Sequence, residues 1–135
     1  MKATGTFSVA SFVPTDVVPD PAVTTALPVG IATISKEYAG EITGRSTTLF
    51  TSAFDHVTGT GTYIAMESFE GALHDRAGSF NFAHSASTRG SDRTDEFFII
   101  VANSGTGELT GISGTGGLTV DSDGVHHIWF DYELD

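Results

Sequence analysis

The sequence predicts an all-β fold that closes into a single antiparallel barrel of about eight strands. Of the 135 residues, 37 are β-branched (19 Thr, 10 Val and 8 Ile), against only 6 Leu. Branching at Cβ costs rotamer freedom in a helix but packs well on a pleated sheet. Apolar and polar residues also alternate with a period of two, and no stretch sustains the 3.6-residue period of a long helix. The length fits one domain, residues 1–135.

The N-terminal half begins with a strand and then an unusually long loop. All four prolines, from Pro14 to Pro28, fall within one short segment. Proline cannot donate a hydrogen bond to a sheet, so this segment is expected to be a loop. The strands expected on either side of it, the last two joined by a turn at Ala39-Gly40, are Ala3–Val13, Val29–Tyr38 and Glu41–Leu49.

The C-terminal half repeats the alternation over shorter strands. The segment Ser85–Asp95 is polar and is expected to be a loop, and Asp121–Gly124 has the composition of a hairpin turn. The apolar run Phe97–Val101 indicates a strand that is buried on both faces or against a partner. The expected strands are Thr60–Glu70, Gly78–Ser85, Phe97–Val101, Glu108–Ser113 and His126–Leu134.

Short connections of this kind are typical of a sandwich or of an antiparallel barrel. The barrel is favoured because glycines stand inside the expected strands, where they permit the bends of a closing sheet. These glycines are Gly5, Gly44, Gly61 and Gly111.

The charge of the chain excludes several classes of partner. Six Lys and Arg against 17 Asp and Glu give a formal net charge of -11. Nucleic acids and anionic membrane surfaces would be repelled, so neither is expected as a partner. No apolar run is long enough for a membrane span, and the N-terminus has no apolar signal-peptide core. We therefore expect a cytoplasmic protein.

Motifs for metals and cofactors are missing. The chain has no Cys, and the adjacent His126 and His127 would face opposite sides of a strand. The glycine-rich segments Ser104–Glu108 and Gly114–Gly117 are interpreted as turns, since a phosphate loop needs a following helix. The sequence predicts neither a metal nor a cofactor.

One group of residues predicts a functional site. Alternation places Tyr63 and Glu67 on one face of their strand and His84 on one face of the next. If the hairpin pairs Glu70 with Ala77, Tyr63 lies opposite His84 and the three polar side chains share a surface with Phe80 and Phe82. In the barrel interior, Glu67 and His84 would be the candidate catalytic acid and base, and burial would raise the pKa of Glu67. The alternative is a buried structural cluster, which gives the same alternation.

Two further residues receive an interpretation. Trp129 shares a face with His127, whereas Ile128 and Phe130 share the other and are expected to pack in the core. Trp129 is therefore assigned to a subunit contact or to the barrel interior. Together with Tyr63, Phe80 and Phe82, it completes the set of candidate ligand-binding residues. Lys36 is interpreted as a solvated surface charge.

Several segments resemble a bacterial domain-of-unknown-function family whose members are similar to allene oxide cyclase in fold. The resemblance covers nearly the whole chain, and its most specific parts are the Gly78–His84 and Ser104–Leu109 stretches. The other segments that carry it are Ala3–Phe7, Gly40–Ser46, Tyr63–Glu67, Gly71 and Asp131-Tyr132. It implies a small eight-stranded barrel with an interior cavity, allene oxide cyclase-like or lipocalin-like. It assigns no reaction and no catalytic residue.

Three functions fit these observations. The first is the binding of a small apolar or aromatic molecule inside the barrel, since a barrel of eight strands either packs full or holds one small ligand. The second is an isomerase or cyclase that uses Glu67 and His84. The third is a structural protein with a filled interior. For each of them we expect a homo-oligomer, because apolar strands such as Phe97–Val101 need cover.

Overall fold

The structure, a computed structural model that describes all 135 residues, is an all-β domain of eight strands. It contains no helix with the length and hydropathy needed to cross a bilayer. One short 3-10 turn, η1, precedes the last hairpin. The elements are β1 (Lys2–Pro14), β2 (Gly30–Gly40), β3 (Ile42–Asp55), β4 (Thr60–Leu73), β5 (Arg76–Arg89), β6 (Asp92–Ile100), η1 (Gly107–Leu109), β7 (Ser113–Val120) and β8 (His126–Glu133).

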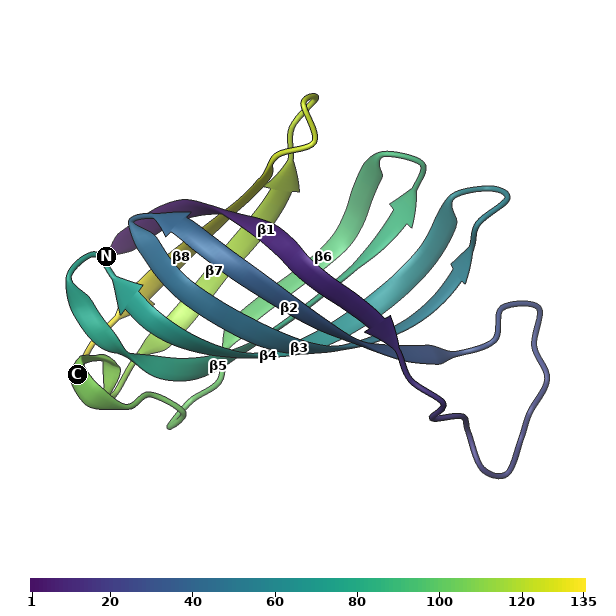
Figure 1. The fold of residues 1–135 in the computed structure, drawn as a ribbon, viewed down its shortest axis with the longest axis horizontal. Coiled ribbons are helices and arrows are strands. Elements are labelled where there is room, and N and C mark those ends of the chain that lie inside the picture. Colours follow the sequence, from purple (N-terminus) through teal and green to yellow (C-terminus); the bar gives the residue numbers. More distant parts are fainter.

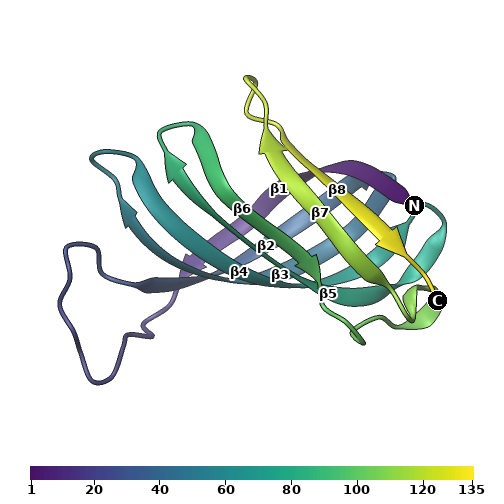
Figure 2. The ribbon, with the colours of Figure 1, turned by 180° about the vertical axis from the view of Figure 1, so that it is seen from behind.

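The strands form one antiparallel sheet in the order β6-β5-β4-β3-β2-β1-β8-β7, which curves into a nearly closed barrel (Figure 1). The predicted barrel of eight strands is therefore confirmed. The two end strands, β6 and β7, share no ladder of backbone hydrogen bonds. Phe98 of β6 instead packs against Phe130 of β8, with ring centroids 5.7 Å apart. Side chains, and not backbone pairing, therefore close this seam, which Figure 2 shows from behind.

Three predicted elements are wrong, and the first is the turn at Gly114–Gly117, which lies within strand β7. Ser85–Asp95 is not a loop, because β5 continues to Arg89 and β6 begins at Asp92, with a tight turn at Gly90. Glu108–Ser113 is not a strand either: it contains η1 and a turn, and the strand follows as β7. Polar and glycine-rich sequence hid both hairpins. In β7 the Trp129 ring covers Gly117, and a Cβ at this position would lie 2.2 Å from that ring, so the ring would have to move.

The predicted bend at Gly44 is present. Gly44 has a φ of +128° and lies opposite Gly71 of β4, which in turn lies opposite Gly78 of β5. A Cβ on Gly44 would stand 2.2 Å from the carbonyl oxygen of Glu70. The two backbones can approach this closely only without a side chain, so this glycine row allows three strands to turn together.

The two ends of the barrel differ. The chain termini, η1 and the β4–β5 turn gather at one end, and the β3–β4, β5–β6 and β7–β8 hairpins project from the other (Figure 1). Aromatic and aliphatic side chains fill the terminal end. Phe80, predicted to bind ligand, belongs to this core and packs between Phe69 and Phe130, with centroid distances of 5.1 and 5.2 Å. The loop 15–29, predicted from its prolines, contains no strand and extends from the hairpin end.

Candidate functional site

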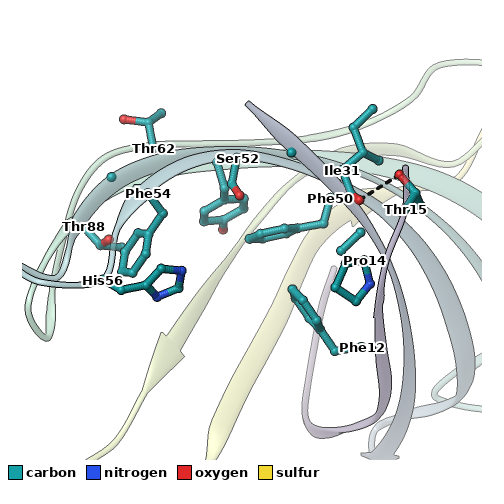
Figure 3. A pocket seen from close by; sticks show the side chains of 14 residues that line it. Phe12, Pro14, Thr15, Ile31, Phe50, Ser52, Phe54, His56, Thr62 and Thr88 are labelled. Carbon is teal, nitrogen blue, oxygen red and sulfur yellow. Dashed lines mark hydrogen bonds between the residues drawn. The ribbon is translucent and has the colours of Figure 1, made fainter. Parts of the chain in front are cut away.

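A cavity of about 460 Å³ opens at the hairpin end of the barrel. Its walls are largely aromatic because Phe50, Ser52 and Phe54 alternate along β3 and so share one face of the sheet. Figure 3 shows the rings of Phe12, Phe50 and Phe54 on the same side of the sheet. Tyr63 of β4 also lines this space.

The aromatic rings of the cavity contact one another and so hold a defined wall. Phe50 stacks on Tyr63 at 5.0 Å between centroids, and Phe12 meets the edge of Phe50 at 6.0 Å. Phe12 is nevertheless 55% exposed. A large aromatic side chain left in water at the mouth of a concavity is the kind of surface that ligands cover.

Tyr63 connects this cavity to a buried polar network. Its hydroxyl lies 2.9 Å from Nδ1 of His84 and 2.9 Å from Nη2 of Arg93. Arg93 in turn donates to Glu96 at 2.8 Å. The phenol is therefore the contact between the cavity and the interior histidine.

Glu67 is the centre of the network and is fully buried. Lys36 Nζ lies 2.7 Å from one carboxylate oxygen, which also accepts a short hydrogen bond from His84 Nε2. The other oxygen accepts from the Tyr38 hydroxyl at 2.9 Å and from Ser46 at 2.8 Å. Both oxygens are thus fully occupied, which is the condition for keeping a carboxylate ionised inside a protein.

The ionised carboxylate fixes the direction of the other hydrogen bonds. Because Glu67 can only accept, His84 carries its proton on Nε2 and its Nδ1 accepts from the Tyr63 hydroxyl. The Tyr63 oxygen then accepts from Arg93. Donation therefore runs in one direction, from Arg93 through Tyr63 and His84 to Glu67.

The expected raised pKa of Glu67 is wrong. Burial alone would raise it, but the hydrogen bond from His84 and the charge of Lys36 outweigh burial and lower the pKa of Glu67 to about 2. Lys36 is one source of the error, because it is not a solvated charge. It is buried, points into the barrel against Glu67, and lies 4.5 Å from the centre of the Phe7 ring.

Acid should destabilise the protein through two members of this network. Burial lowers the pKa of His84 more than its bond to Glu67 raises it, and the pKa of Glu67 is also lowered. When the pKa of a group is lower in the folded than in the unfolded protein, the group contributes stability at pH values above its unfolded pKa. That contribution is lost as the pH falls from the unfolded pKa to the folded pKa. We expect the free energy of unfolding to decline below about pH 6.5 through His84 and again below about pH 4.5 through Glu67. Urea titrations from pH 8 to pH 3 measure this, and a constant value over that range would contradict the assignment.

The predicted hairpin register is wrong by two residues. The β4–β5 turn lies at His74-Asp75, so Glu70 pairs with Ser79 and Glu67 lies opposite Phe82. His84 lies opposite Ala65, one pair from Glu67. A slip of two keeps every side chain on its face of the sheet. Tyr63, Glu67 and His84 therefore still meet.

Of the other predicted site residues, neither Phe82 nor Trp129 lines the cavity. Phe82 stacks on His84 at 5.8 Å and belongs to the hydrophobic core, so it connects the network to the core. Trp129 lies on the opposite face of β8 from Phe130, over Gly117, and does not line the cavity. Sequence reasoning missed Phe12 and Phe50 and the polar partners of Glu67. The available signal was the alternation Ile34, Lys36, Tyr38, which places Lys36 on an inward face.

The comparisons with known proteins agree on a family. The family described as "Protein of unknown function (DUF3224)" matches residues 3–132. The chain is also similar to the crystal structure of a protein with unknown function from the DUF3224 family of Shewanella oneidensis MR-1, with 30% sequence identity and a TM-score of 0.82. That similarity covers 100% of this chain and 98% of the other. The curated proteins gave no match.

Proposed function

Since this chain belongs to the DUF3224 family, a family without an assigned function, we propose from its geometry that it binds a small apolar or aromatic molecule in the cavity at the hairpin end. The observation that carries the proposal is the aromatic wall around a space of about 460 Å³. Ligand sites of small molecules have volumes of roughly 300–1,000 Å³ and are lined mainly by apolar and aromatic side chains. Side chains pack the terminal end of the barrel and form the hydrophobic core. The hairpin end is therefore not needed for the core and can hold a ligand.

The polar groups of the cavity are consistent with a ligand that carries one polar atom on an apolar body. Tyr63 presents its ring to the cavity and holds its hydroxyl against His84 and Arg93. Ser52, His56 and Thr88 add hydrogen-bonding groups at the wall. No Asp, Glu, Lys or Arg side chain lines the cavity, which favours an uncharged ligand.

The network favours binding over an isomerase or cyclase that uses Glu67 and His84. Glu67 has no solvent exposure, and its oxygens are occupied by four donors. A general base must reach the proton that it removes. Glu67 instead orients His84, which in turn orients the Tyr63 hydroxyl. A structural protein, the third function, would have a filled interior. Here side chains fill the terminal end, and the cavity remains at the hairpin end.

A fluorescent apolar probe tests the proposal. N-phenyl-1-naphthylamine, which is neutral, should bind with an emission increase, and Phe12→Ser should weaken binding about tenfold, or about 1.4 kcal/mol. The matched control is Val13→Ser, since Val13 neighbours Phe12 in β1 and is 56% exposed against 55% for Phe12 but lies outside the cavity. Equal losses from both variants, or no emission increase in the wild type, would contradict binding in the cavity.

A further inference from the structure

A second apolar surface lies on the outer face of the barrel, on the opposite side of the sheet from the cavity. It is formed by outward side chains of β3, β4 and β6 that are 43% to 63% exposed. We call it the outer patch, and its residues are Leu49, Ile64, Met66, Phe97 and Ile99.

Strand register makes these side chains neighbours. Leu49 lies opposite Met66, and the same row continues through Ala83 of β5 to Ile99. In the adjacent row Ile64 lies opposite Ser85, which pairs with Phe97. Directly opposed side chains are about 5 Å apart. The outer patch is therefore one continuous surface across four strands.

Charged side chains are missing from these rows although the chain has a formal net charge of -11. On one side the patch is bordered by the neutral row Thr47, Ser68 and Asn81, and Arg45 and Glu70 stand one row further. Asp95 and Glu96 precede Phe97 at the edge strand. A polar rim around an uncharged centre is the anatomy of a protein interface.

We propose that the outer patch is a homodimer interface, in which the patches of two copies pack face to face about a two-fold axis. Two molecules of this chain repel each other over most of their acidic surface, and the uncharged rows are where that repulsion is weakest. The five side chains expose on the order of 500 Å², and a standard stable interface buries about 800 Å² per partner. The remaining area would come from the neutral rim, where Thr47 and Ser68 are exposed and Asn81 is half-buried.

Solution mass tests the dimer. Light scattering at about 50 µM should give twice the 14.1 kDa of one chain. Ile64→Asp should convert the protein to monomers, because two buried carboxylates would meet across the axis. Val57→Asp is the matched control, since Val57 is 94% exposed at the β3–β4 turn and outside the patch. A monomeric wild type, or an Ile64→Asp variant that stays dimeric, would overturn the proposal.

Cross-linking keeps the test independent of the folding of Ile64→Asp. The chain has no Cys, so a single introduced thiol can form a disulfide only between copies. Ile64→Cys and Met66→Cys should give covalent dimers under mild oxidation, and Val57→Cys, although more exposed, should give far less. Equal cross-linking at all three positions would mean random collision and would overturn the interface.

Discussion

Replacing Glu67 with Gln is expected to lower the free energy of unfolding by about 3–5 kcal/mol at neutral pH. The substitution keeps the shape of the side chain but leaves the ammonium group of Lys36 buried without a counter-charge. Gln also has one acceptor oxygen where Glu has two, so its NH2 group must face either Lys36 and His84 or the Tyr38 and Ser46 hydroxyls, and the donors on that side lose their acceptor. Urea denaturation followed by circular dichroism measures the change.

A double-mutant cycle tests whether the loss comes from the ion pair between Lys36 and Glu67 or from mutation of a buried residue in general. Lys36→Met alone should also be destabilising, whereas the double variant Lys36→Met with Glu67→Gln should recover part of the loss, because no unpaired charge remains. Glu70→Gln is the control, since its bridge to Arg45 is exposed and contributes at most about 1 kcal/mol. Strictly additive single effects, or a Glu67→Gln variant as stable as Glu70→Gln, would contradict the buried pair.

The second large effect is expected from Gly44→Ala, at roughly 3 kcal/mol or more. The new Cβ would require a φ of +128° and would lie 2.2 Å from the Glu70 carbonyl oxygen, a backbone atom that cannot rotate away. Both the strain and the clash act on the glycine row where β3, β4 and β5 bend together. Thermal unfolding of the variant measures the loss.

Substitutions at two other glycines separate the cost of backbone strain from the cost of the steric clash. Gly90→Ala places a Cβ in open space but at a φ of +62°, so it should cost only about 1–2 kcal/mol. Gly30→Ala meets neither obstacle and should change stability by about 0.5 kcal/mol or less. If Gly44→Ala were no worse than Gly90→Ala, close approach of the backbones would not be what requires glycine there.

The parts of the fold that follow from local pattern were predictable. Alternation of period two placed Tyr63, Glu67 and His84 on inward faces, and this result survived the error in register because a slip of two residues preserves the face. The long proline loop was also predictable, since proline lacks the backbone donor that a ladder needs.

The parts that depend on distant contacts were not predictable. Lys36 and Glu67 are 31 residues apart in sequence. The local alternation places Lys36 on an inward face, but nothing local identifies the carboxylate that pairs with it. The strand character of β7 depends on its pairing with β8, where the Trp129 ring occupies the space above Gly117. Without that contact in view, four residues with three glycines are typical of a turn. The cavity wall likewise needs Phe12 from β1 beside Phe50 from β3.

The seam between β6 and β7 affects how large a molecule the barrel can hold. In an unbroken barrel the circumference is fixed by the ladder, and widening it would break backbone hydrogen bonds. Here the circumference can grow at the seam at the cost of side-chain contacts, such as those of Phe98 with Phe130 and with Gly116 of β7, and without breaking a ladder of backbone hydrogen bonds. Phe98 also stacks on His84 at 5.8 Å, and His84 is hydrogen-bonded to Tyr63 of the cavity wall. A change in the circumference of the barrel would therefore shift the His84 ring.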